Sequence, residues 1–548
     1  MQRQVSVDSE PNETNPVRAW DIVNNPILMR YRRSRLRRRK LIPWALLVLI
    51  VSLFVVGLLV AVSKNSDIPM RELARLGLVI IIVLQSLMLL FLGTGAVAVG
   101  IIQESAEGMV EYQRLTPMTP LAKIVGYVFG LPIREYVLAS LQFPFVFLTA
   151  WLGDIAWDSL TRFYLILFMA GVLYHLTGMV VGTVARKKFI AGRTAQLMVF
   201  LLYVVLPRFA HLGFIFLLYL TVLPAWYEQA SPYLPQGAEF ANWVPGLGYE
   251  VPWFFWEFGP TGFSFFIQGA LIFVLMVILA RRWRDAQAHL MSNHFAVLVF
   301  AGIALLLLGN SYPIIESGAI FLTMTNFNAQ SFTGLSLALV GVALLSLLMT
   351  FIRLVTPTRD EARRGFRRAA KLKRSRVAPF SDDVTALWTV GVLLLIAIGT
   401  WILYASKLTS SEMIQGNITL YQLWPLAFAA SLTLPIVAYH AVLEWLGARA
   451  VLLALLLAWI VPAMVAVICM AANNQTLATY SASLSGFLMP IYAVVQMVEP
   501  SPDREMGNTV KHAFWFAMIV YALLVPALLV KLQRHRRELM HDTGFRNA

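Results

Sequence analysis

The sequence predicts an all-α polytopic membrane protein with about twelve transmembrane helices in two six-span halves. Apolar residues make up 59% of the 548-residue chain and charged residues 13%, against about 45–50% and about 25% in soluble proteins. Apolar runs long enough to cross a bilayer recur along the whole length. Basic residues gather in every second connection between these runs, which is typical of alternating membrane crossings.

The predicted spans follow these apolar runs. In the first half they are 42–63, 76–100, 134–153, 161–185, 195–223 and 262–280. In the second half they are 294–309, 332–353, 386–405, 421–445, 450–472 and 512–530. We expect a basic tail over 1–40, a six-span half over 41–290, and a second half over 291–548 with a basic loop at 354–385.

Orientation follows from the basic connections. The run RYRRSRLRRRK before the first span, the loops at 186–193, 281–285 and 359–376, and the C-terminal tail fall on one side when twelve spans are counted. Basic loops mark the cytoplasmic side, so both termini are expected there. The formal net charge of +15 is then explained by membrane topology, and no nucleic-acid partner is expected.

Two outer segments break the pattern. If 482–498 crossed the membrane, the basic tail would lie outside, so this segment is expected to re-enter or to lie on the outer face. Residues 230–261 hold the matching position in the first half and are expected to do the same. Their tryptophans Trp243, Trp253 and Trp256 suit a membrane interface. A shared outline, and similar basic ends at 279–291 and 529–540, indicate either a degenerate duplication or a chance arrangement.

The stretch IIQESAEGMVEYQRLTPMTP, residues 101–120, is acidic although it lies between apolar runs. Its spacing predicts one amphipathic helix on the cytoplasmic side, ended by Pro117. The predicted polar face carries Glu104, Glu107, Glu111 and Arg114, and the apolar face Ile102, Ala106, Met109 and Val110. An acidic face does not favour anionic lipid. It is either a solvated helix without a partner or a contact for a basic protein surface.

Two patterns carry a family resemblance. One is Glu104, Gly108 and Glu111 followed by Leu-Thr-Pro at 115–117 and by Gly126; the other is Asn-Pro-Ile-Leu at 25–28 before a basic helix. Together with six spans and an outer excursion, they resemble the type-two permease family of ATP-binding-cassette (ABC) exporters over residues 24–290. Met109 stands where that family often has Thr, and Tyr127 where it often has Lys.

The resemblance implies a permease subunit of a bacterial inner-membrane exporter. A separate ABC ATPase subunit would bind ATP and Mg and push on the cytoplasmic helix. The residues implied in this coupling are Glu104, Glu107, Gly108, Glu111, Arg114, Thr116 and Pro117. Membrane lipids are further partners, and pairing as a homodimer or with a second permease both stay open.

The chain carries no phosphate-loop motif G-x-x-x-x-G-K-[ST] and no zinc-type His or Cys spacing. We therefore expect no catalytic residue, no metal and no cofactor in this chain, and ATP hydrolysis only in the partner. The single Cys469 excludes an intrachain disulfide.

Ionisable residues at membrane depth are candidates for function or for structural hydrogen bonds between helices. They are Arg134, Glu135, His175, Arg208, His211, His440 and Glu444. His440 and Glu444 are four residues apart and are expected to pair on one helix face. Arg134 and Glu135 are expected to pair with a neighbouring span. The small residues Gly93-Thr94-Gly95 and Gly100 indicate close helix packing.

Two alternatives to a permease stay open. A membrane-embedded enzyme acting on a lipid-linked substrate would use His440 and Glu444 as acid and base. A membrane scaffold would recruit partners through the basic loop at 359–376. That loop is interpreted either as a degenerate coupling element or as an anchor over anionic lipid, and the second interpretation is favoured.

Overall fold

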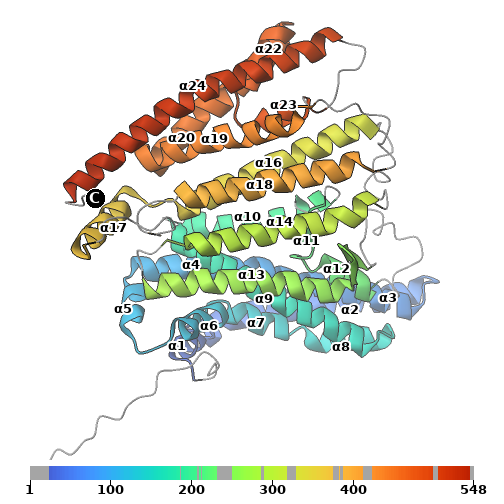
Figure 1. Ribbon diagram of the computed structural model, residues 1–548. Helices are drawn as coiled ribbons and strands as arrows, with labels where there is room; N and C mark the ends of the chain where they lie inside the picture. Colours follow the sequence, from blue (N-terminus) through green and yellow to red (C-terminus); the bar gives the residue numbers. More distant parts are fainter. Residues whose placement is uncertain are drawn as a thin grey trace, which may run out of the picture. The chain divides into compact units, whose positions relative to one another are not determined.

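The computed structural model describes residues 24–185, 187–205, 209–210, 213–230, 250–285, 289–316, 329–373, 382, 387–411, 422–495, 497 and 504–543. Nearly all of the described chain is helical (Figure 1). Within it, eleven helices are long and apolar enough to cross a membrane. The protein is therefore an all-α, membrane-integral protein, as the composition predicts.

The elements of the first part of the chain are as follows. They are α1 (Pro26–Arg35), α2 (Arg38–Asn65), α3 (Met70–Ser86), the π-helix η1 (Leu87–Leu92), α4 (Gly93–Ala106), α5 (Met109–Leu115), α6 (Pro120–Gly130), α7 (Ile133–Ser140), α8 (Phe143–Leu152), α9 (Trp157–Val184), α10 (Lys188–Val204), α11 (Ile215–Leu218), α12 (Leu223–Ala230), β1 (Val251–Trp253), β2 (Trp256–Phe258) and α13 (Pro260–Arg284).

The described elements of the second part of the chain are all helices. Its elements are α14 (Asn293–Glu316), α16 (Ala329–Val355), α17 (Arg359–Lys371), α18 (Leu387–Thr409), α19 (Trp424–Leu446), α20 (Ala448–Leu455), the π-helix η5 (Leu456–Ile460), α21 (Val461–Ala471), α22 (Gln475–Ser483), α23 (Met489–Val495) and α24 (Arg504–Asp542).

Eleven of the predicted spans coincide with the apolar helices, and the fifth does not. In place of a span over 195–223 the structure has α10, a helix of 17 residues. At about 1.5 Å per residue it is about 25 Å long, short of the roughly 30 Å apolar thickness of a bilayer. The apolar run is broken in the sequence by Pro207-Arg208. A twelfth crossing stays a prediction.

The chain divides into two compact units. Unit 1 comprises Met1–Val204, Leu220–Ala238 and Ser264–Ala286, and unit 2 comprises Val205–Tyr219, Glu239–Phe263 and Gln287–Ala548. The division after 286 lies close to the predicted one at 290, but the connections at 205–219 and 239–263 join unit 2. An origin of the two halves by duplication stays a hypothesis.

Close crossing of α4 and α9 organises unit 1. A Cβ atom added to Gly178 or Gly182 of α9 would lie 2.6 Å from the carbonyl oxygen of Thr94 and 2.8 Å from that of Ala98. Side chains therefore cannot stand between these two backbones. On α4, a Cβ at Gly95 would lie 2.8 Å from the Gln196 side chain of α10. The predicted use of the small residues in 93–100 for helix packing is confirmed.

Unit 2 is ordered around buried aromatic rings. Trp401 of α18 stacks on Phe428 of α19 with ring centroids 3.9 Å apart, and its Nε1 donates to the carbonyl of Leu337 in α16 at 3.0 Å. Gly341 makes room for this indole, because a Cβ there would lie 2.4 Å from it. Three spans of this unit are thereby held at one point.

The two outer segments differ from each other. Within 230–261, residues 231–249 with Trp243 lie outside the described part, and the remainder forms the antiparallel hairpin of β1 and β2, where Trp253 stacks on Trp256 at 5.5 Å. Asn310 of α14 binds this hairpin by donating to the carbonyl of Pro252 at 2.9 Å. Residues 482–498 contain α23 and the end of α22, which have 7 and 9 residues, too short to span, as expected.

Candidate functional site

The acidic stretch 101–120 is not one helix. Helix α4 ends at Ala106, Gly108 adopts the left-handed conformation with φ of 71°, and α5 begins at Met109. Glycine takes this conformation without steric cost and commonly ends helices in this way. Figure 1 shows α5 turning away from the direction of α4. The predicted single amphipathic helix is therefore wrong, because an αL residue in its middle resets the helical phase.

Glu104 is the residue most affected by this change. It is 8% exposed and does not share an exposed face with Glu107 and Glu111. Its Oε1 accepts bonds from Arg30 and from the hydroxyl of Tyr31, and its Oε2 accepts from the hydroxyl of Tyr127 at 2.5 Å. A buried carboxylate needs such donors. We call Glu104, Arg30, Tyr31 and Tyr127 the Glu104 cluster.

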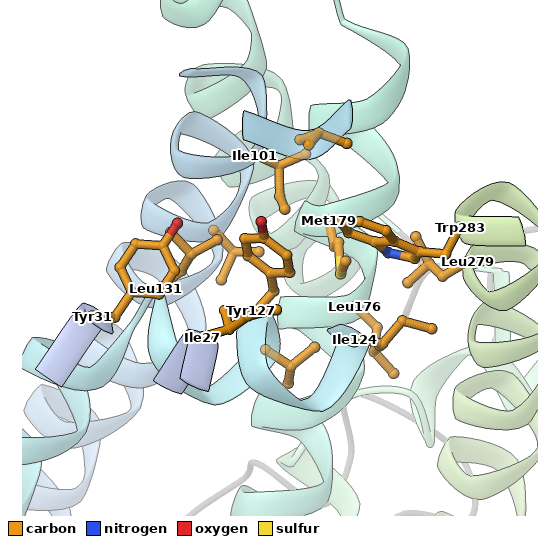
Figure 2. Packing of buried hydrophobic residues seen from close by; sticks show 13 residues of the cluster. Ile27, Tyr31, Ile101, Ile124, Tyr127, Leu131, Leu176, Met179, Leu279 and Trp283 are labelled. Carbon is orange, nitrogen blue, oxygen red and sulfur yellow. The ribbon is translucent and has the colours of Figure 1, made fainter. Parts of the chain in front are cut away.

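The Glu104 cluster joins three helices, since Arg30 and Tyr31 belong to α1 and Tyr127 to α6. Figure 2 shows both tyrosine hydroxyl groups pointing in the same direction from a shared apolar core, with Trp283 of α13 beside Tyr127. The Tyr127 and Trp283 rings are stacked at 5.4 Å. Burial raises the pKa of the Tyr31 hydroxyl to about 12, against the lowering effect of Arg30 and Arg35. The Tyr31 hydroxyl therefore keeps its proton at neutral pH and donates it in the hydrogen bond to Glu104.

Asn25 and two glycines bring α1 against α6. The Asn25 side chain caps α1 by accepting from the backbone of Ile27 at 3.0 Å, and it donates to the carbonyl of Ala122 at 2.7 Å. A Cβ at Gly126 would lie 2.6 Å from Asn25 Oδ1, and one at Gly130 would lie 2.9 Å from the Tyr31 ring. The motifs that carry the family resemblance thus meet in space, as a helix cap on a close helix contact.

Lys123 holds the other end of α5. Its ammonium donates to the carbonyls of Arg114 at 3.3 Å and Thr116 at 3.2 Å, where α5 leaves carbonyls without helical partners. Burial, and then the charge of Arg114, lowers the pKa of Lys123. Thr116 donates to the carbonyl of Gln113 at 2.7 Å. Pro117, which follows, is exposed.

Arg114 connects α5 to α13. It forms an ion pair with Glu111, donates to the carbonyl of Arg282 at 3.4 Å, and lies 6.0 Å from the Trp283 ring centroid. The α5 segment is thereby held to α6 by Lys123 and to α13 by Arg114, while α1 and α6 hold Glu104 at the end of α4. Its outer side is left uncovered in unit 1 and carries Glu107, Glu111, Tyr112 (62% exposed), Leu115 (85% exposed) and Pro117. We call these five residues the α5 surface.

The remaining candidates of unit 1 have structural partners. His175 is fully buried; its Nδ1 is 3.0 Å from the Tyr136 hydroxyl and its Nε2 is 3.0 Å from the carbonyl of Leu89 in the π-helix η1. Arg134 forms an ion pair with its neighbour Glu135 at 2.6 Å, and its guanidinium lies 5.8 Å from the centre of the Trp44 ring in the span α2. Arg208 and His211 lie outside the described residues.

In unit 2, the pair predicted from spacing is part of a larger group. His440 Nε2 lies 3.4 Å from Glu444 Oε2. Arg536 of α24 binds both oxygens of Glu444 at 2.6 Å, and Thr356 lies 3.4 Å from His440 Nδ1. With Glu444 held in a two-pronged ion pair, this arrangement ties α16, α19 and α24 together. Over the described residues, no group of three or more His, Cys, Asp or Glu has metal-binding geometry.

Sequence reasoning missed Arg30, Tyr31, Lys123, Trp283 and Arg536. Arg30 belongs to a basic run whose composition indicates only topology, and Tyr127 stands where the resembled family often has Lys. The structure gives both a specific partner in Glu104. One signal in the sequence could have indicated this cluster. It is an acidic residue directly after an apolar span, in a chain with Tyr and Arg at the start of the preceding span.

The chain was compared with protein-family models, with curated proteins and with solved structures, and nothing matches in any of the three comparisons.

Proposed function

We propose that this protein is the membrane-spanning subunit of an ATP-driven exporter and that the α5 surface contacts a separate ABC ATPase. The observation that carries this proposal is that one side of the α5 segment is bound to neighbouring helices while its other side is exposed. Polar bonds hold α5 to α6 and α13, and they hold Glu104 at the end of α4 to α1 and α6. Tyr112 and Leu115 are exposed beside two carboxylates. Exposed aromatic and apolar residues inside a charged surround are typical of protein-binding surfaces.

The position of α5 supports transmission of a push. It follows directly on a continuous 37-residue span, Met70–Ala106, and α4 crosses α9 at backbone contact distance. Movement of α5 would therefore act on packed helices and not on a loose loop. In this proposal the partner binds ATP and Mg, both termini and α5 are cytoplasmic, and the membrane is a bacterial inner membrane.

The correction to Glu104 changes which residues face the partner. Glu107 and Glu111 are exposed and take the role of contact residues, whereas Glu104 positions the segment from within. Gly108 sets the turn, Arg114 and Thr116 secure the end of α5, and Pro117 lies at the edge of the surface. We assign no catalytic residue to this chain.

The test is a double variant, Glu107→Gln with Glu111→Gln, expressed with its ATPase. Two exposed charge pairs at about 0.2–1 kcal/mol each predict a roughly two- to thirtyfold loss of ATPase recovered with the tagged chain. The matched control is Asp154→Asn with Asp158→Asn, since these are exposed carboxylates of the same unit and each forms an ion pair with an arginine, as Glu111 does. Equal loss in both variants, or no loss in the first, would overturn the proposal.

A further inference from the structure

Unit 2 contains an apolar pocket that is separate from the α5 segment. Its volume is about 760 Å³, and it lies between α16, α19, the α20–α21 helices and the connection between α22 and α23. Volumes of this size suit an organic ligand. Apolar side chains make up most of the wall, including Trp459, Met464, Val467 and Phe487.

The pocket is long in the direction of the helices. Along α20–α21 its lining runs from Leu455 to Val467, about 18 Å at about 1.5 Å per residue. One leaflet of a bilayer contributes about half of the roughly 30 Å apolar thickness. The pocket therefore matches the extension of a single acyl chain. This wall belongs to the span Ala450–Ala471. Only 17% of the residues in its most apolar stretch are buried, so the span exposes a large apolar surface.

A guanidinium group lies in the lining of this apolar pocket. Arg353 belongs to the last turn of α16, at the end of the span Thr333–Val355, and donates to the hydroxyl of Tyr439. In the described part of the chain, no carboxylate is in ion-pair contact with Arg353. An arginine beside apolar walls favours an anionic partner, and its planar donors match phosphate oxygens.

A second polar group in the lining has no partner. Ser485 is 1% exposed, and its Oγ lies buried without a hydrogen bond among the described residues. A buried hydroxyl without a partner is costly in a protein interior. An ester or glycerol oxygen of a bound lipid supplies a partner of the required kind.

We propose that this pocket binds an anionic phospholipid, with one acyl chain along α20–α21 and the phosphate on Arg353. The charge on the helix that follows Arg353 in the chain agrees with this occupant. Helix α17 begins four residues after Val355 and carries exposed basic residues, namely Arg359, Arg364, Arg367, Arg368 and Lys371. Its apolar residues Ala362, Phe366 and Ala369 pack against Leu539 of α24, so α17 offers the membrane charge and not an inserting face.

The test uses the purified full chain and a phosphatidylglycerol with brominated acyl chains, which quench tryptophan fluorescence at contact. We expect saturable quenching that is reduced in Trp459→Phe, because Trp459 lines the pocket. In Arg353→Gln the lipid concentration for half-maximal quenching rises at least about fivefold, the effect of one basic residue near an anionic surface. Arg534→Gln, an exposed position of α24, leaves it unchanged.

Two comparisons make the result decisive. Brominated phosphatidylcholine is expected to bind more weakly than the anionic lipid to the unaltered chain and equally to Arg353→Gln. Inorganic phosphate is expected not to displace the lipid at equal concentration. Quenching that is identical in Arg353→Gln, unchanged in Trp459→Phe, or abolished by inorganic phosphate would overturn the proposal. Thermal unfolding without lipid shows whether each variant is folded.

Discussion

The hydroxyl of Tyr127 donates to Oε2 of Glu104 at 2.5 Å. Tyr127 belongs to α6, which begins sixteen positions after Glu104. This bond links the end of a span to α6. Replacing the tyrosine, as Tyr127→Phe, leaves that carboxylate oxygen without its donor inside the fold. We expect a loss of about 1–3 kcal/mol in the free energy of unfolding, measured by denaturant or thermal unfolding in detergent. Tyr112→Phe, at an exposed position, should change it little; equal effects would contradict the role of the Glu104 cluster.

Substitution of Gly108 tests the turn between α4 and α5. A Cβ added there meets nothing within 4 Å, so the cost of Gly108→Ala is conformational only, about 1–2 kcal/mol for an L-residue at positive φ. Gly108→Asn should cost less, because Asn tolerates this region. Gly57→Ala is the control, since its Cβ also meets nothing but its φ is ordinary. A Gly108→Ala protein as stable as Gly57→Ala would contradict the left-handed turn.

Spans and helix contacts followed from local patterns, and that explains what the sequence predicted well. Long apolar runs and the small residues of α4 can be recognised from the neighbouring sequence alone, since neither depends on a distant partner. The spacing of His440 and Glu444 likewise gave their proximity. Arg536 could not be found in this way, because it lies 92 positions beyond Glu444, and no local period connects them.

The candidate site shows the other limit. Helical spacing placed Glu104 with Glu107 and Glu111, but one left-handed residue, Gly108, separates the two helices and changes the side that each carboxylate faces. The hairpin of β1 and β2 was missed because Pro, Gly and Trp content indicates an interfacial segment without indicating its backbone. The predicted fifth span, 195–223, coincides with α10 only in part, because the apolar composition of the sequence continues beyond the end of that helix.

The crossing of α4 and α9 predicts a difference between two glycines of one helix. In Gly182→Ala the new methyl group would lie 2.8 Å from the backbone oxygen of Ala98, whereas in Gly171→Ala its nearest neighbour is 4.0 Å away. Forcing a methyl group into a tight contact costs about 1–3 kcal/mol. Thermal unfolding should therefore separate the two variants, with Gly171→Ala close to the unaltered protein. The same midpoint for both would contradict the close crossing.

Arg536 should be important for the stability of unit 2. Glu444 has 8% of its side chain exposed and would be left uncompensated in Arg536→Met. Breaking a buried ion pair at one partner costs about 3–5 kcal/mol. The second change, Glu444→Gln, should recover part of this loss, and Arg534→Met at an exposed position should cost little. If the double variant is less stable than Arg536→Met, the assignment of the ion pair is wrong.

The most direct measurement of the central claim is crosslinking from the α5 surface in cells that naturally express the chain. A photoreactive amino acid at position 112 should form an adduct with an ATPase that carries the phosphate-loop motif, whereas the same group at Phe255, 88% exposed in the hairpin of unit 2, should not. ATPase adducts from 255 but not from 112, or none from either position, would contradict the assignment of α5 as the contact with an ATP-hydrolysing partner.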